Sequence, residues 1–149
     1  MFTRSPPPRP MGATLVLDQP VAAAPAQVYA AWVSADGLSH WWWPHIPDTI
    51  YDVDARIGGR YKIRSEAAGI GVRGEFLELD PPKLIRLTWN WMDDGVSAVE
   101  EHVRVDFTPT PDGTLVTLTH QLADSSGDGD DLRQGWRDVL ARLAGMAGE

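Results

Sequence analysis

The last stretch of the chain carries the clearest hydrophobic pattern. Between Asp130 and Ala147 the apolar side chains recur every three or four residues, and charged or amide side chains fill the other face. The apolar positions are Leu132, Trp136, Val139, Leu140, Leu143 and Met146. This spacing predicts an amphipathic helix. Asp128 and Asp131 place negative charge near its expected start, and Gly145 and Gly148 lie where we expect it to end.

The middle of the chain has a period of two, which is typical of strands with one buried face. The predicted strands are Thr14–Val21, Tyr51–Asp54, Arg60–Ser65, Val72–Leu79, Leu84–Trp91, Val99–Phe107 and Thr114–Leu122. Turn-forming residues separate them, as in Asp93-Asp94-Gly95 and in the segment from Pro109 to Gly113. These short connections predict antiparallel neighbours.

Two short helices are expected after the first strand. Pro25 suits the first position of a helix, because its missing N–H would be unpaired there. We therefore expect a helix over Ala26–Ser34. A second helix is predicted over Gly37–Trp42, capped by Asp36 and stopped by Pro44.

The elements together predict an α+β fold. A helix of roughly 18 residues is about 27 Å long and cannot bury its apolar face alone. We expect a curved antiparallel sheet of about six to seven strands to cover it, with the two short helices after the first strand. Residues 13–149 would form one domain, and residues 1–12 a disordered, proline-rich tail.

Composition narrows the range of partners. The 149 residues carry a formal net charge of −8, which argues against nucleic acid and anionic membrane surfaces. No apolar run approaches the ~20 residues of a membrane span. The chain has no cysteine, which excludes disulfides, thiolate metal sites and thiol catalysis. We expect a cytoplasmic protein without a cofactor.

The tryptophan content points to a cavity. Seven tryptophans in 149 residues are many, and a buried indole needs a partner for its N–H. The inward strand and helix positions predict an aromatic wall, with the segment Trp41–Trp43, and Trp42 in particular, at its mouth. The wall would comprise Tyr61, Phe76, Leu87, Trp89, Trp91, Val103, Val105, Leu118 and Trp136. Any one of these side chains could instead be plain core.

Glu101 and His120 share strand parity with the inward apolar positions. Neighbouring strands would place them side by side, and a histidine partner would relieve the cost of a buried carboxylate. Three interpretations stay open: a satisfied pair at the rim of the core, a polar anchor for a ligand, or an acid–base pair. We therefore assign no catalytic residue, although His120 and Glu101 are the candidates. Predicted ligand contacts are Trp42, Tyr61, Phe76, Trp89, Trp91, Glu101, His120 and Trp136.

A metal site is not expected. His40 and His45 flank the tryptophan segment and Asp48 follows, but their spacing matches no motif with a known mechanism. The glycine pairs Gly69/Gly71 and Gly127/Gly129 also lack the spacing and the lysine of a phosphate-binding loop.

Several local motifs occur in an order that resembles a known superfamily. They are Pro25–Trp32, Leu38–Pro44, Ile57–Lys62, Gly74–Pro82, Leu87–Trp89, Gly113–His120 and Gly135–Leu140. In this order they resemble the SRPBCC superfamily, which has the helix-grip fold of START domains and the birch-pollen allergen. Within it, the chain looks most like the family named for the activator of the heat-shock-protein-90 ATPase. The resemblance spans residues of about 14 to 145.

The resemblance implies a helix-grip fold and leaves the activity open. The function that best suits the residues is binding of a hydrophobic or aromatic small molecule between the sheet and the C-terminal helix. One alternative is an enzyme of cyclase or hydrolase type in the same cavity. The other is a co-chaperone-like interaction domain with Trp41–Trp43 as an exposed patch. A homodimer is a further expectation, because edge strands need cover.

Overall fold

The computed structural model describes residues 11–94, 96–123 and 129–147. Residues 1–10, and with them most of the predicted proline-rich tail, lie outside this described part. Met11 and Gly12, which we assigned to the tail, belong to the first strand.

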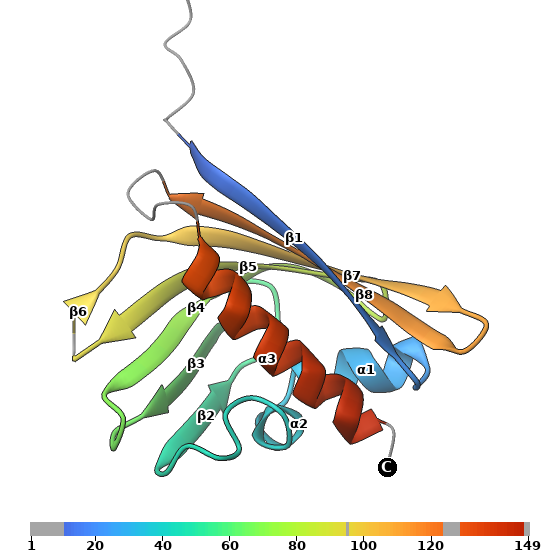
Figure 1. Ribbon diagram of the computed structural model, residues 1–149, viewed down its shortest axis with the longest axis horizontal. Helices are drawn as coiled ribbons and strands as arrows, with labels where there is room; N and C mark the ends of the chain where they lie inside the picture. The colour runs from blue at the N-terminus through green and yellow to red at the C-terminus, as the bar shows by residue number, and fades with distance from the viewer. Residues whose placement is uncertain (1–10, 95, 124–128, 148–149) are drawn as a thin grey trace, which may run out of the picture.

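The chain forms an antiparallel sheet and three helices (Figure 1). The helices are α1 (Pro25–Trp32), α2 (Ala35–Ser39) and α3 (Asp130–Ala147). The strands are β1 (Met11–Val21), β2 (Thr49–Val53), β3 (Arg60–Ser65), β4 (Ile70–Asp80), β5 (Leu84–Asp93), β6 (Val96–Ser97), β7 (Glu101–Thr110) and β8 (Gly113–Ala123). The predicted α+β class and the order of elements are confirmed.

In the sheet, the N-terminal strand β1 pairs with the last strand, β8. Its strand order is β1-β8-β7-β5-β4-β3-β2, and the two-residue β6 pairs with β5. Each neighbouring pair is antiparallel. The strands curve around α3, which crosses one face of the sheet diagonally (Figure 1). The short helices α1 and α2 lie near the C-terminal half of α3. This is the predicted helix-grip arrangement, with β1 and β2 at the two edges.

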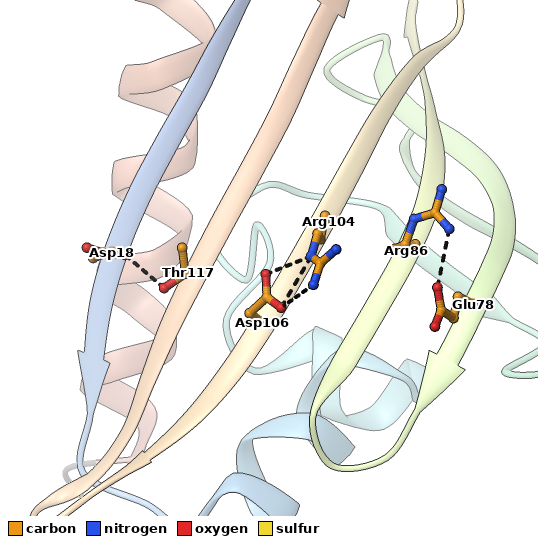
Figure 2. Close-up of polar contacts among 6 residues, drawn as sticks. All are labelled: Asp18, Glu78, Arg86, Arg104, Asp106 and Thr117. Atoms are coloured by element: carbon orange, nitrogen blue, oxygen red, sulfur yellow. Dashed lines mark hydrogen bonds and ion pairs between the residues drawn. The ribbon is translucent and has the colours of Figure 1, made fainter.

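Strand alternation separates a buried face from a solvated one. On the face away from α3, polar side chains pair with one another (Figure 2). Thr117 donates to Asp18 across β8 and β1 at 2.8 Å, and Arg86 donates to Glu78 across β5 and β4 at 3.2 Å. Such exposed pairs contribute at most about 1 kcal/mol each. The buried face must therefore supply most of the stability, and its central residues, such as Val105 and Leu118, are fully buried.

The second short helix begins and ends earlier than predicted. Its N-cap is Ser34, whose hydroxyl accepts the backbone N–H of Gly37 at 3.0 Å, so the predicted cap Asp36 lies in the first turn instead. Serine is as good a cap as aspartate, and Ser34 already has the extended backbone that a cap requires. The helix ends at Ser39, which leaves the tryptophan segment in turns.

A glycine in β4 allows the strands to approach closely. Gly74 lies opposite Tyr61 of β3. A Cβ at this position would lie 2.0 Å from the backbone oxygen of Thr88 and 2.7 Å from the ring of Tyr61. The same Thr88 oxygen accepts the Tyr61 hydroxyl at 2.5 Å, so it cannot move away without breaking that bond. Position 74 thus has no room for a side chain.

We predict that Gly74→Ala lowers the free energy of unfolding by about 1–3 kcal/mol or more, because the added methyl group overpacks the β4–β5 contact. Urea denaturation followed by circular dichroism would measure the change. Gly145→Ala is the control, since a Cβ there meets nothing within 4 Å and alanine favours the helix by up to about 1 kcal/mol. Equal stability of Gly74→Ala and the parent protein would contradict the prediction.

Candidate functional site

An apolar cleft opens between α3, β5 and the segment after α2. Its volume is about 350 Å³, and five of the seven tryptophans line its walls. The lining residues are Trp42, Trp43, Trp89, Trp91, Asp131, Leu132, Gly135, Trp136 and Val139. The cleft lies along the N-terminal part of α3, because its lining residues from this helix run from Asp131 to Val139.

A second, much smaller cavity lies against the cleft. Its volume is about 30 Å³, which leaves room for little more than one water-sized group. Its lining residues are Trp32, Leu38, Trp42, Tyr61, Ile63, Phe76, Leu87, Trp89 and Trp136. We call it the inner cavity. Trp42, Trp89 and Trp136 belong to both walls, so these three rings stand between the inner cavity and the cleft.

The predicted cavity is therefore largely filled. Val103, Val105 and Leu118, which we expected in its wall, line neither space and are buried core. Tyr61 and Phe76 line the inner cavity but not the cleft, whereas Trp91 lines the cleft but not the inner cavity. The side chains fill the space beneath the middle of the sheet, and the open volume lies toward the N-terminal end of α3.

The rings that separate the two spaces pack as an aromatic cluster. Trp42 meets Trp136 edge-on, with ring centroids 5.3 Å apart, and the centroids of Trp89 and Trp136 lie 5.0 Å apart. Trp43 meets Trp91 edge-on at 5.7 Å. Edge-on and tilted contacts of this kind are the favourable geometries for aromatic pairs, each contributing about 0.5–1.5 kcal/mol. The cleft thus has rigid walls.

The tryptophan segment after α2 is buried, which corrects its expected exposure. Trp41, Trp42 and Trp43 are 0%, 4% and 9% exposed. Three consecutive inward side chains require an irregular backbone, and Trp43 has a left-handed φ of 54°. The Trp41 indole donates to the backbone oxygen of Ala31 at 3.0 Å, and the Tyr51 hydroxyl donates to the backbone oxygen of Trp42. These bonds hold the segment against α1 and β2, so it cannot be the exposed contact patch of a co-chaperone-like domain.

A chain of buried hydrogen bonds ties α3 to the sheet. The Trp136 indole donates to Nδ1 of His120 at 3.0 Å, and Nε2 of His120 lies 2.7 Å from Oε1 of Glu101. The other Glu101 oxygen accepts the backbone N–H of Ala123 at 3.0 Å. An indole can only donate, so Nδ1 must accept and the imidazole proton must lie on Nε2. A neutral ring in this tautomer satisfies both bonds.

The structure thus brings Glu101 and His120 together, but away from the cleft. His120 is fully buried, and both of its ring nitrogens are engaged. Neither residue lines the cleft or the inner cavity. Glu101 borders a neighbouring hollow of about 400 Å³, which shares Trp89, Trp91, Asp131 and Leu132 with the cleft. The pair meets the cleft walls through Trp136, which bonds to His120, and through Trp89, whose ring centroid lies 5.2 Å from that of His120.

Two indole N–H groups are buried without a partner. In the described part of the chain, no hydrogen-bond acceptor reaches Nε1 of Trp32 or of Trp42, although the indoles of Trp41 and Trp136 both donate. The Tyr61 hydroxyl, in the same wall, donates to Thr88. Burial raises the pKa of Tyr61 far above its usual value, so this hydroxyl stays protonated. The expectation that each buried indole finds a partner fails at Trp32 and Trp42.

Sequence reasoning missed several residues of the cleft. Trp32 faces the inner cavity from α1, and Leu132, Gly135 and Val139 line the cleft from α3. The signal for α3 was present, because these positions share the apolar helix face with Trp136. A glycine on such a face leaves a gap, and we had not assigned Gly135 a role in the wall.

Another hollow has a different character. It measures about 850 Å³ and lies over the polar residues of β2 to β5. Its four basic and four acidic side chains are Arg56, Arg60, Lys62, Arg73, Asp52, Asp54, Glu75 and Glu100. The balance of charges gives it no preference for an ionic ligand, so we do not regard it as the candidate site.

Metal binding and membrane insertion find no support in the described residues. Among them, no three histidine, cysteine, aspartate or glutamate side chains are grouped to hold an ion. His40 instead lies 3.9 Å from Asp36 on the surface. Within the same residues, no helix combines the length and apolar character that crossing a bilayer requires.

Comparison with known families agrees with the fold. Residues 22–148 match the family described as Activator of Hsp90 ATPase homolog 1-like protein, abbreviated AHSA1. The chain belongs to this family. The motifs that suggested the resemblance fall almost wholly inside the matched range.

Several solved structures share the architecture. Protein CV1439 from Chromobacterium violaceum is 25% identical, with a TM-score of 0.75 over 91% of this chain and 97% of its own. An AHSA1-like protein from Aeromonas hydrophila is 23% identical, with a TM-score of 0.68 over 91% of this chain and 94% of its own. DynU16, a protein in the dynemicin biosynthetic locus, is 19% identical, with a TM-score of 0.74 over 88% of this chain and 45% of its own. No curated protein matches the sequence.

The hydrogen-bond chain gives the first testable consequence of the site. We predict that His120→Ala lowers the free energy of unfolding by about 1–3 kcal/mol or more, because it removes one hydrogen bond from the buried Glu101 carboxylate and the acceptor of the Trp136 indole. Trp136→Phe should cost about 1–3 kcal/mol by leaving Nδ1 unpaired. The double variant should cost less than the sum, with a coupling of about 0.5–3 kcal/mol.

Urea denaturation of the four proteins in this cycle measures the coupling. Thr117→Val is a control on the same strand, since it removes only the exposed bond to Asp18 and should cost less than about 1 kcal/mol. Additive effects of the His120 and Trp136 substitutions would show that the two side chains do not stabilise each other.

Proposed function

We propose that this protein binds a small apolar, ring-bearing molecule in the cleft. The observation that supports this most is the cleft itself, a 350 Å³ space walled by indoles, Leu132 and Val139, with Asp131 as its one charged residue. Sites for small molecules usually have volumes of about 300–1,000 Å³ and mainly apolar walls. A planar ring system would find both size and stacking surfaces there.

Gly135 favours the interpretation that the cleft is a binding site and not merely a packing defect. It lies within α3, where glycine costs about 1 kcal/mol relative to alanine. A Cβ at this position would meet nothing within 4 Å. A larger residue here would stabilise the helix and fill the gap at no steric cost. The sequence instead has the one residue that keeps this wall open.

The predicted contact residues take two roles under this proposal. Trp42, Trp89, Trp91 and Trp136 touch the ligand, because they line the cleft. Tyr61 and Phe76 lie behind them in the wall of the inner cavity. Glu101 and His120 are positioning residues, since they hold the Trp136 ring through the hydrogen-bond chain.

Binding accounts for this geometry better than catalysis does. Both nitrogens of His120 are engaged, so the ring could exchange a proton with a ligand only after a bond to Glu101 or Trp136 had broken. A general acid or base must lie within hydrogen-bond reach of the reacting group. Neither His120 nor Glu101 lines the cleft where a ligand would lie.

The test is a titration with N-phenyl-1-naphthylamine, a neutral aromatic probe, followed by the quenching of tryptophan fluorescence. We expect saturable binding by the parent protein. Gly135→Leu should raise the Kd at least about tenfold, which is ~1.4 kcal/mol, because the leucine side chain occupies the cleft. Thermal unfolding of the variant should occur at or above the parent temperature.

Gly145→Leu is the matched control. Gly145 lies on the same helix, and a Cβ there also meets nothing within 4 Å, but it does not line the cleft. Its Kd should equal that of the parent protein. The proposal fails if the parent protein does not bind the probe saturably, or if the two leucine variants bind it equally well.

A further inference from the structure

We infer that the ligand of the cleft carries a hydrogen-bond acceptor, such as a ring-conjugated carbonyl oxygen, which enters the inner cavity and accepts the indole N–H groups of Trp42 and Trp32. The inference rests on the proposed function and adds a chemical class to it. The ligand would be a planar aromatic carbonyl compound, in preference to a hydrocarbon or an amine.

The unpaired donors are the first support. Nε1 of Trp32 and Nε1 of Trp42 are buried without a partner, and their side chains are only 6% and 4% exposed. Burying a donor without an acceptor is unfavourable, so a ligand that brings one gains an interaction which water does not offset. Both residues line the inner cavity, so one acceptor there can serve either N–H.

The composition of the inner wall is the second support. Its nine side chains contribute indole N–H groups and one phenol, and no carboxylate, amide or imidazole. The phenol of Tyr61 donates to Thr88, and the Trp136 indole donates to His120. A donor or a cation in this cavity would therefore face further donors. An acceptor oxygen complements the wall, and the 30 Å³ volume suits a single small group.

The third support is that the two spaces share a wall. Trp42 lines both the cleft and the inner cavity, and it shares this position with Trp89 and Trp136. A flat ring system in the cleft would lie against these rings. A carbonyl oxygen on its edge would project past Trp42 toward Trp32, whose ring centroid is 6.5 Å from that of Trp42. The body of the ligand and its acceptor would thus occupy the cleft and the inner cavity respectively.

The experiment compares 9-fluorenone with fluorene, which have nearly the same shape and differ by one carbonyl group. Affinities would be measured by fluorescence quenching of the parent protein. Burial of apolar surface alone favours fluorene, the more hydrophobic compound. We expect the opposite order, with fluorenone binding at least about fivefold more tightly, because its oxygen satisfies a buried donor.

Spectra of the indole N–H groups locate the acceptor. In ¹H–¹⁵N correlation spectra, the resonances of the Trp32 and Trp42 indole protons should shift downfield when fluorenone is added. They should not shift downfield when fluorene is added. The Trp41 indole already donates to the protein and lies outside both walls, so it serves as the internal reference. Single tryptophan-to-phenylalanine variants assign the resonances.

Two variants separate the N–H from the ring. Trp42→Phe keeps an aromatic ring and removes a donor. The ratio of the affinities for fluorenone and fluorene should therefore fall toward the value that apolar burial alone would give. Trp43→Phe is the matched control, because Trp43 lines the cleft but not the inner cavity. It should retain the full preference.

The outcomes distinguish this inference from the proposed function. If both compounds bind and fluorene binds equally or more tightly, the cleft is a ligand site without acceptor selectivity, and the inference is overturned. The same holds if the Trp32 and Trp42 protons already resonate at bonded positions in the free protein and fluorenone leaves them there, since water would then satisfy them. If neither compound binds, the proposed function fails and this inference fails with it.

Discussion

The hydrogen bond from Trp136 to His120 decides where α3 lies on the sheet. Apolar burial holds the helix down, with Leu140 and Leu143 almost completely buried, but that force has no direction and tolerates small shifts. The indole N–H has a single acceptor at 3.0 Å, and His120 is itself fixed by Glu101. The fixed tautomer makes this contact specific, because a ring protonated on Nδ1 could not accept the bond. The position of one aromatic ring therefore sets the wall shared by the cleft and the inner cavity.

The cleft follows from an uneven distance between the helix and the sheet. The backbone of α3 approaches β1 most closely, so the space toward β5 must be filled by side chains. At the C-terminal half, Leu140 and Leu143 fill it and are 1% and 0% exposed. At the N-terminal half, Gly135 contributes no side chain and bulky indoles stand around the gap. One helix thus serves as core toward its C-terminus and as a wall of the cleft toward its N-terminus.

The sequence predicted what depends on local periodicity. Strand parity placed Glu101 and His120 on the inward face, where the structure has them in contact, and the helical spacing predicted α3 over Asp130–Ala147. It could not predict how the interior fills. Val103 and Leu118 point inward as expected, yet they are buried core and line neither the cleft nor the inner cavity. The burial of Trp41–Trp43 depends on the left-handed backbone conformation of Trp43. Tryptophan does not favour this conformation, so the sequence did not predict it.

The same limit applies to function, since fold alone does not choose a ligand. The AHSA1-like protein from Aeromonas hydrophila keeps this architecture at 23% sequence identity, and a shared scaffold can hold different sites. Specificity must come from the groups that line the open space. Most of them here are apolar and would accept any ring of suitable size, so they discriminate weakly. Two buried donors without a partner are different, because leaving them unpaired costs free energy with every ligand that lacks an acceptor. Selectivity among ligands of similar shape would therefore come from the indole nitrogens of Trp32 and Trp42, while the rest of the wall supplies affinity.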